Sequence, residues 1–565
     1  MFVNPRMTHD GVLGVRPSDP GWVRVRCEWS RFLQLATLLL ALAALSTTSA
    51  VGAAVPRTSS GGLTSHGRTR STLQGPAGVQ ARWVIAENMK RGTTGWRIPN
   101  AMPPGTIAGF ASSDDAVQGE WVAFRITAPS PTFSVVAYRM GWYGGAGARA
   151  VWSSPRFKGQ AQPTCTFTAG VNLVSCANWS LSFRLRIGRA FVQGDYLFKL
   201  TASTGQESYV PLTISDRRSK AAYLVINRTF TEEGWNAWGG YDFYLGQGTC
   251  APTYPVCNRA RIVSYDRPFD TGNGASDFFG NEYPLIQLME REGLDVGYVT
   301  DTALNADPKL ELGHKVLLSL GHDETWSTPE RQGIDAAIAA GANVVFFGAA
   351  AVLRHVRMEA SSLGPERLEV NYRDSAEDPM NGSGNPLEVT GNTFASPPTN
   401  WSEVPLTGEE YAGYLDGTAS VPFVVQNASA FVFKRTGLKN GDQLKGVVMS
   451  DFDHIAVGAG SPQNVEVLGH SPVLASLAYT NQGTWNGQTF SDMTYYTDAA
   501  GGGVIDTGTV NWIYSLNSCA PGESICQSGT VTRITENILS AFGSGPAGRR
   551  FPAQPNWQGL EPLTG

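Results

Sequence analysis

Residues 315–347 read KVLLSLGHDETWSTPERQGIDAAIAAGANVVFF, and this stretch carries the clearest prediction of the fold. Residues 315–320 and 343–347 are apolar runs, typical of strands that are buried on both faces of a sheet. Between them, Ser327 and Glu330 have the spacing of a capping box, which predicts a helix that runs on to the next glycine. A strand, a helix and another strand in this order indicate a parallel sheet.

The same alternation of strands and helices continues on both sides of this stretch. The expected elements are strands at residues 221–226, 296–300, 446–450 and 504–505, and helices at residues 284–292 and 535–541. We therefore expect residues 216–543 to form an α/β domain with a mostly parallel, doubly wound sheet. A stretch at about residues 360–440 is predicted to be a loop-rich insertion in this domain.

A different pattern precedes the α/β domain. Residues 120–126, 133–138 and 195–201 alternate between apolar and polar side chains and are separated by glycine, proline and asparagine. This pattern is typical of short antiparallel strands. Residues 81–215 are therefore predicted to form an all-β, Ig-like sandwich.

The first 80 residues predict export rather than folded structure. Three arginines precede the apolar run at residues 32–45, and small residues follow it, as in a secretory signal peptide that ends near residue 53. The alternative is a membrane anchor, but the run is short for a span of about 20 residues. Residues 54–80 are predicted to be a flexible linker, and residues 544–565 a flexible tail. We expect the protein to be secreted or held in the cell envelope.

Six of the seven cysteines lie beyond the predicted leader and form three close pairs. The pairs are Cys165 and Cys176, Cys250 and Cys257, and Cys519 and Cys526. In an exported protein this spacing predicts three local disulfides. Metal binding by thiolates is the alternative, but the chain has no CxxC motif to favour it.

Length and charge limit the classes of partner. A chain of 565 residues is expected to hold two or three domains. The net charge is −5, and the leader carries five arginines and three acidic residues, so the rest of the chain has a charge of −7. This balance argues against nucleic acid and anionic membranes as partners. No second apolar stretch predicts a membrane span, and a homo-oligomer is compatible with the sequence.

Polar residues follow the predicted strands, where ligands bind in open parallel sheets. His322, Asp323 and Glu324 follow residues 315–320 and are the catalytic candidates, because they can supply a general base or metal ligands. The three are consecutive, so at most two can point at one atom. The alternative is that Asp323 and Glu324 interact with the N-terminus of the next helix.

Other strand ends supply candidate binding residues. These are Arg228, Asp301, Asp451, Asp453 and His454. The last three are candidate metal ligands or members of a simple turn. Trp235 and Trp238 lie among glycines after the first strand, where they can stack on a sugar-like ligand or cover a domain interface. The sequence contains no GxSxG, Walker A, GxGxxG or HExxH motif, which argues against the enzyme classes that use them.

Six motifs together carry a family resemblance. They are YRMGWYGGAGAR (residues 138–149), GWNAWGG (234–240), SYDRP (264–268), EYPLI (282–286), YVTD (298–301) and GHDETWS (321–327). As a set they resemble the C-terminal region of the large (beta) subunit of N,N-dimethylformamidase, over residues 120–540. The resemblance implies a sandwich joined to a sheet domain similar to class I glutamine amidotransferases.

The resemblance also implies a chemistry. The enzyme that defines the family hydrolyses a small tertiary amide, using one iron held by two tyrosines and a glutamate. Tyr283 matches one tyrosine, Thr325 stands at the position of the other, and Glu403 and Glu409 are candidates for the glutamate. A threonine hydroxyl is a poor substitute for a phenolate on ferric iron. The motifs thus imply an iron site with one ligand replaced.

Two functions follow as hypotheses. The first is an exported hydrolase of C–N bonds in small amides, with His322 and Glu324 as acid and base and water as the nucleophile. The second is a non-catalytic exported protein that binds cell-envelope carbohydrate through Trp235 and Trp238.

Overall fold

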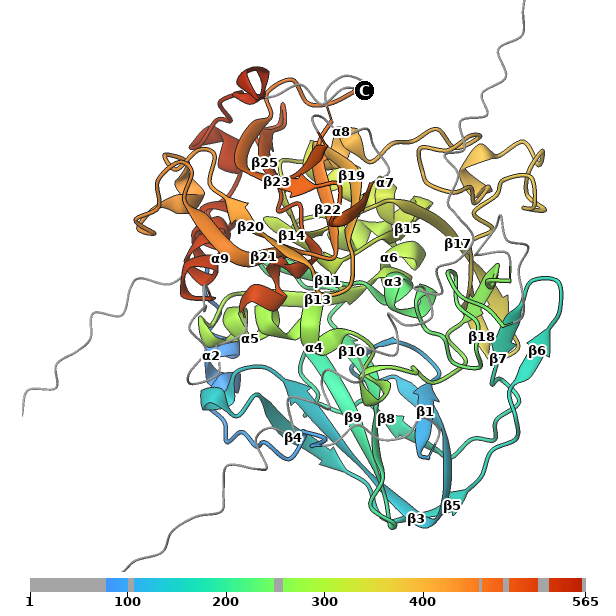
Figure 1. Ribbon diagram of the computed structural model, residues 1–565. Coiled ribbons are helices and arrows are strands. Elements are labelled where there is room, and N and C mark those ends of the chain that lie inside the picture. The colour runs from blue at the N-terminus through green and yellow to red at the C-terminus, as the bar shows by residue number, and fades with distance from the viewer. Residues whose placement is uncertain are drawn as a thin grey trace, which may run out of the picture. The chain divides into compact units, whose positions relative to one another are not determined.

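Five parallel strands lie at the centre of the structure, a computed structural model that describes residues 78–99, 106–247, 258–456, 460–480, 487–516 and 528–560. They belong to a seven-stranded sheet, which two antiparallel strands complete at one edge (Figure 1). In order across the sheet, the strands are β13 (Val296–Thr300), β11 (Tyr223–Asn227), β14 (Val316–His322), β16 (Asn343–Ala349), β26 (Gly503–Asp506), β25 (Gln488–Thr497) and β23 (Glu466–Leu474).

Helices cover both faces of this sheet because its central strands are apolar on both sides. Leu224 and Ile226 of β11 belong to one core, and Tyr223 and Val225 belong to the core on the opposite face. The first core includes residues of α6 and α7, and the second includes residues of α5 and α9. These helices are α5 (Tyr283–Arg291), α6 (Asp301–Ala306), α7 (Thr328–Ala339) and α9 (Ser528–Gly543).

Two of these helices begin and end where their sequences predict. At the start of α7, the Ser327 side chain accepts a hydrogen bond from the Glu330 N–H, and the Glu330 carboxylate accepts one from the Ser327 N–H. This confirms the predicted capping box. Gly293 follows α5 with a φ of 67°, a conformation that glycine adopts without strain and that ends a helix.

Residues 106–215 form a second large sheet of eight strands around a separate core. The strand β3 is 20 residues long and pairs with five neighbours, among them β1, β8 and β9 (Figure 1). The strands are β1 (Ala108–Ala111), β2 (Asp115–Val117), β3 (Trp121–Met140), β4 (Ala148–Ser153), β5 (Phe157–Gln160), β8 (Phe183–Arg186), β9 (Gly194–Ala202) and β10 (Glu207–Ser215). Pairing is antiparallel except between β2 and β10.

Four smaller sheets complete the described part of the chain. Two of them are pairs of strands: β6 (Thr166–Thr168) with β7 (Leu173–Ser175), and β20 (Ser420–Val424) with β21 (Gln443–Met449). A four-stranded sheet consists of β12 (Ile262–Ser264), β18 (Gly364–Val370), β17 (Arg354–Ser361) and β15 (Thr325–Ser327). A three-stranded sheet consists of β22 (Asp451–Ile455), β19 (Glu409–Leu415) and β24 (Ala478–Thr480). Shorter helices are α2 (Arg82–Asn88), α3 (Thr229–Gly234), α4 (Phe278–Asn281) and α8 (Val404–Thr407).

The predicted fold class, a parallel α/β domain similar to class I glutamine amidotransferases, is wrong. More residues lie in strands than in helices, and most sheets are antiparallel or mixed. The alternation of strand and helix is confined to residues 223–349. Residues 360–440, predicted to be loop-rich, contain parts of β17 to β20, and residues 446–450 contribute to β21, which pairs with β20 rather than with the central sheet. β17 and β18 form a local hairpin, whereas β19 and β20 pair with segments beyond residue 440 that no local pattern identifies.

Two buried contacts join distant parts of the chain. The Tyr223 hydroxyl accepts a hydrogen bond from the Val79 N–H and donates one to the Leu539 carbonyl. Arg139 of β3 and Glu290 of α5 form an ion pair of 2.5 Å, and neither side chain is exposed. The eight-stranded sheet is therefore fastened to α5, a helix that covers the seven-stranded sheet, by charge as well as by packing.

The Cys165–Cys176 disulfide is present. The other two predicted disulfides, Cys250–Cys257 and Cys519–Cys526, lie outside the described residues, as do the predicted signal peptide and most of the linker. Among the described residues, no helix combines the length and the apolar character that crossing a membrane requires.

Candidate functional site

The candidate site lies where β14 ends, at His322, and the chain turns sharply into β15. Gly321 makes this turn with a φ of 59°, and a Cβ atom there would lie 2.5 Å from the Cβ of Asn281. The turn separates the side chains that follow it. Asp323 points back into the protein and accepts a hydrogen bond from the Ser319 hydroxyl at 2.7 Å, whereas Glu324 faces a different set of partners. Of the three catalytic candidates, only His322 and Glu324 therefore lie together.

Glu324 is held by three donors from three parts of the chain. The Trp235 indole N–H and the Tyr244 hydroxyl donate to its Oε2 at 3.1 and 2.5 Å, and Arg354 Nε donates to its Oε1 at 3.0 Å. His322 Nε2 lies 3.4 Å from the same Oε2. We call these five residues the Glu324 site. Glu324 is 3 % exposed, so its carboxylate exchanges water almost entirely for protein donors.

Electrostatics keep Glu324 ionised. Burial by itself would raise the pKa of its carboxyl, but His322, Arg354 and the Tyr244 hydroxyl outweigh burial and hold the pKa below the ordinary value. Burial and the neighbouring Glu324 charge raise the pKa of Tyr244 far above its usual range, so Tyr244 stays a neutral donor. Glu324 is therefore an acceptor that can orient the imidazole, and it is not a proton donor at neutral pH.

Aromatic packing fixes the walls of the Glu324 site. The Trp235 ring stacks on Tyr244 with ring centroids 3.8 Å apart and planes 13° apart, and the His322 ring lies 5.7 Å from Trp235. The Arg373 guanidinium lies 4.8 Å from the centre of the Tyr244 ring. His322 is partly open to solvent, with 14 % of its side chain exposed, so a ligand can reach the site at this residue.

Arg228 supports the site from behind. Its Nη1 donates to the His322 carbonyl at 3.1 Å, and its other nitrogens lie 3.2 to 3.5 Å from the carboxylates of Asp277, Glu282 and Glu232. The guanidinium is buried, so these acidic neighbours supply the counter-charge that burial requires. Arg228, predicted as a ligand-binding residue, thus fixes the end of β14 and faces a cluster of acids.

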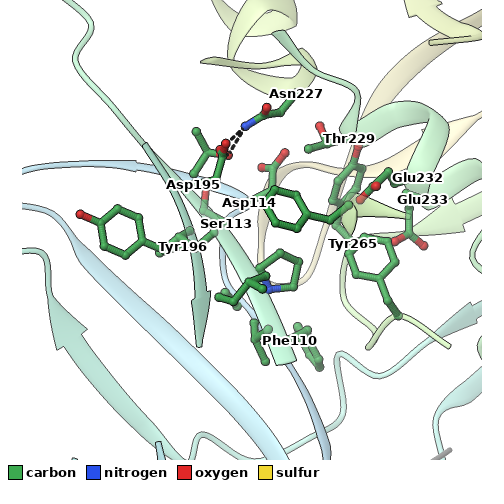
Figure 2. A pocket seen from close by; sticks show the side chains of 18 of the residues that line it. Phe110, Ser113, Asp114, Asp195, Tyr196, Asn227, Thr229, Glu232, Glu233 and Tyr265 are labelled. Atoms are coloured by element: carbon green, nitrogen blue, oxygen red, sulfur yellow. Dashed lines mark hydrogen bonds between the residues drawn. The ribbon is translucent and has the colours of Figure 1, made fainter. Parts of the chain in front are cut away.

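A cavity of about 70 Å³ lies beyond that cluster, between β9, β10 and the end of β11 (Figure 2). Figure 2 shows Asp195 and Asn227 joined by a hydrogen bond at one side, with Asp114, Thr229 and Glu232 around the space. Burial raises the pKa of Asp195 and of Glu232 to about 7. The second oxygens of both carboxyls have no hydrogen-bond partner, which is typical of a cavity that holds water.

The other predicted binding residues lie in separate environments. Trp238 packs edge-on against Trp179, with ring centroids 6.5 Å apart, and is not in contact with Glu324 among the described residues. Asp301 is buried and accepts a hydrogen bond from the Phe230 N–H at 2.8 Å. Asp451 accepts one from the Tyr411 hydroxyl at 2.9 Å. The two tryptophans therefore do not form a single stacking surface.

Asp453 and His454 also separate, because consecutive residues of a strand point to opposite faces. His454 Nε2 lies 3.2 Å from Glu410 Oε1. Asp453 meets Glu409 and Asp506 instead, and one oxygen from each of these three carboxylates lies within 4.8 Å of the others. Glu409 was implied by the resemblance, whereas Asp506 was missed, although it directly follows the predicted strand at residues 504–505.

The residues implied for iron are not brought together by any described contact. The Tyr283 hydroxyl donates to the Gly147 carbonyl at 2.8 Å, and its ring packs against Trp96. Glu403 accepts a hydrogen bond from Ser402 at 3.3 Å, and Thr325 bonds through its N–H to Thr231. With Tyr283 engaged in this way and Thr325 in place of the second tyrosine, these residues do not fit the iron site that the resemblance implies. We derive no step through iron.

Two residues of the Glu324 site carried no signal in the sequence. Tyr244 lies beyond the glycines that follow Trp235, and Arg354 is the first residue of β17, beyond the predicted strand at residues 343–347. Neither belongs to a motif with a defined spacing, and Arg354 is 30 residues from Glu324. Only the folded chain brings them to the carboxylate.

Comparison with known proteins gives one match. The family model described as N,N-dimethylformamidase beta subunit-like, C-terminal, matches residues 134–526, which is more than half of the chain. A search of curated proteins finds no match. The matched region includes β11, β14 and β16 and every residue of the Glu324 site. The chain therefore belongs to the N,N-dimethylformamidase beta subunit-like, C-terminal family.

Proposed function

We propose that this protein is an exported hydrolase of C–N bonds in small amides, with His322 as its acid and base. One observation carries the proposal: a buried, ionised Glu324 lies 3.4 Å from the partly exposed imidazole of His322. A carboxylate beside a histidine orients the ring and stabilises its protonated form. Family membership supports amides as the substrate class. The Cys165–Cys176 disulfide and the leader pattern support export.

The chemistry requires water as the nucleophile. His322 takes a proton from water as the water oxygen bonds to the amide carbonyl carbon. The imidazolium then gives that proton to the amide nitrogen as the C–N bond breaks, which yields a carboxylic acid and an amine. Arg354, held on the other oxygen of Glu324, is the residue placed to compensate negative charge near the reacting carbonyl.

The structure favours this function over binding of envelope carbohydrate through the tryptophans. One face of the Trp235 ring is covered by Tyr244, and its N–H is bonded to Glu324. Trp238 packs with Trp179. A sugar would therefore have to compete with contacts that these rings already make inside the protein.

The test is a screen of small primary, secondary and tertiary amides for amine release by the purified protein. With the best substrate, His322→Ala is expected to lower kcat by on the order of 100-fold or more, the usual contribution of an acid–base residue. Glu324→Gln keeps the size of the side chain but loses its charge, so kcat should fall while KM changes little. Glu359→Gln, at an exposed position of β17, is the matched control.

Folding is checked by circular dichroism, so that a lost activity is not mistaken for unfolding. If His322→Ala and Glu324→Gln fold and retain the wild-type rate on every substrate that is hydrolysed, His322 is not the base. If no amide is hydrolysed, the proposed activity is wrong.

A further inference from the structure

A second cluster of polar side chains lies apart from the Glu324 site, at the carboxyl end of β26. Glu409 is the first residue of β19, Asp453 is the middle residue of β22, and Asp506 is the last residue of β26. Antiparallel pairing of β19 with β22 places Glu409 opposite Ile455, which is two residues beyond Asp453 and on the same face of the strand. The exposed fractions of the three residues are 0 %, 3 % and 0 %. The central sheet thus ends on three buried carboxylates.

Among the residues that the structure describes, these carboxylates have no basic partner to offset their charge. The charged groups that act on Glu409 are Asp506, Asp453 and Asp492, which are all acidic. Within the described residues, no arginine or lysine is among the main groups that shift the pKa of Asp453 or of Asp506. Burial, followed by repulsion from Asp506, raises the pKa of Glu409 and of Asp453 well above the ordinary range. Three buried charges with no counter-charge would cost several kcal/mol each.

Three oxygens of this cluster also have no hydrogen-bond donor among the described residues. Both carboxylate oxygens of Glu409 and Oδ2 of Asp506 are buried without a hydrogen-bond partner. Thr494 lies opposite Asp506 in the β25–β26 pair, and its hydroxyl is beside Glu409. This hydroxyl is also buried, and it makes no hydrogen bond within the usual limits of distance and angle. By contrast, Asp453 accepts two hydrogen bonds from the Ala350 N–H. Glu409 is thus a fully buried carboxylate without a hydrogen-bond partner, and one of its oxygens lies within 4.8 Å of an oxygen of Asp453 and of Asp506.

We propose that Glu409, Asp453 and Asp506 bind a divalent cation that prefers oxygen ligands, and that the cation is Ca²⁺. All the donors are oxygens, which favours hard cations over zinc or copper. The three oxygens lie within 4.8 Å of one another, a spread that ligands of one Ca²⁺ at roughly 2.3–2.6 Å can span. Ca²⁺ accepts flexible coordination by carboxylates, whereas Mg²⁺ demands near-octahedral geometry and keeps several waters, so a fully buried set of carboxylates favours Ca²⁺.

This cation would join three elements that are far apart in the sequence. β19, β22 and β26 belong to two different sheets, and the cluster lies between them. The expected role is therefore structural, and it is independent of the His322 chemistry. With this cation bound, Glu409 belongs to a ligand set without tyrosine, unlike the iron ligands that the family resemblance implied.

The test uses the whole protein, purified without chelator, and measures both metal content and stability. We expect about one calcium per chain by mass spectrometry. Removal of metal with EDTA should lower Tm, and added CaCl₂ should restore it. Asp506→Asn should bind no calcium and show no change of Tm with CaCl₂. Glu410→Gln is the matched control, because Glu410 is next to Glu409 but faces His454, and it should behave as wild type.

Two outcomes would overturn the proposal. If the wild type contains no metal and neither CaCl₂, MgCl₂ nor MnCl₂ changes its Tm, the carboxyls share protons instead of a cation. If Mg²⁺ or Mn²⁺ raises Tm more than Ca²⁺ does, the choice of Ca²⁺ is wrong. Should Asp506→Asn fail to fold, Glu409→Gln serves in its place, and calorimetric titration of the EDTA-treated wild type with CaCl₂ still decides the question.

Discussion

Replacement of Asp195 by asparagine is expected to make the protein more stable at alkaline pH. Asp195 lies in β9 at the edge of the buried cavity, where it accepts hydrogen bonds from the Asn227 amide and, at 3.3 Å, from the Thr213 hydroxyl. Its Oδ2 and the Asn227 Oδ1 have no partner. Burial raises the pKa of Asp195 from 3.8 to about 7, although the two hydrogen bonds act in the opposite direction.

The sign and size of the effect follow from this pKa. The folded protein binds the proton more tightly than the unfolded chain, so the contribution to stability is complete below about pH 4. It is lost progressively as pH rises through about 7. A difference of about three pKa units corresponds to about 4 kcal/mol, as an upper limit for one isolated group. Asparagine does not ionise, so Asp195→Asn should not lose this stability. Its amide can also donate to the free Asn227 Oδ1.

Urea unfolding at pH 5, 6.5 and 8 measures the effect. The free energies of unfolding of wild type and Asp195→Asn should be closest at pH 5 and should diverge as the pH rises to about 7, in favour of the variant. Asp416→Asn, at an exposed position, controls for the loss of one negative charge. Parallel curves for wild type and Asp195→Asn between pH 5 and pH 8 would refute the reasoning, because they would show that Asp195 does not titrate in this range.

Two further predictions concern contacts that join elements. Glu290→Gln leaves Arg139 buried without its counter-charge, so the free energy of unfolding in urea should fall by about 3–5 kcal/mol. A loss below about 1 kcal/mol would mean that Tyr143 and other neighbours are enough to stabilise the buried charge of Arg139. Ser327→Ala removes the cap of α7 and should cost about 1 kcal/mol in the same measurement, whereas an unchanged midpoint would show that the first turn of α7 does not need the serine.

Local signals in the sequence predicted local structure well. The apolar runs at residues 221–226, 296–300 and 343–347 overlap β11, β13 and β16, and the capping box marks the start of α7. Each of these signals lies within one element, because burial on both faces and capping are determined by neighbouring residues. The order of these elements also brought His322 and Glu324 correctly to a strand end.

Pairing between distant segments was not predictable in the same way. β25 and β23 extend the central sheet in antiparallel orientation, and β17 to β20, which lie wholly or partly where a loop-rich insertion was expected, belong to separate sheets. Register in such strands depends on partners that one sequence does not identify. The Glu324 site has the same character, since Trp235 lies 89 residues before the carboxylate that it binds. The glycines around Trp235 indicated a loop, but they did not indicate that its indole N–H bonds to Glu324.

The hydroxyl of Tyr223 has a consequence for how the chain reaches its native state. It bonds residue 79 on one side and residue 539 on the other, so the first strand of the central sheet is complete only when the last helix has arrived. The ribosome must release nearly the whole chain before these contacts close, and such long-range contacts make folding slow. A fragment cut at residue 526, where the family match ends, would lack α9 and leave that hydroxyl and the apolar face around it open to water.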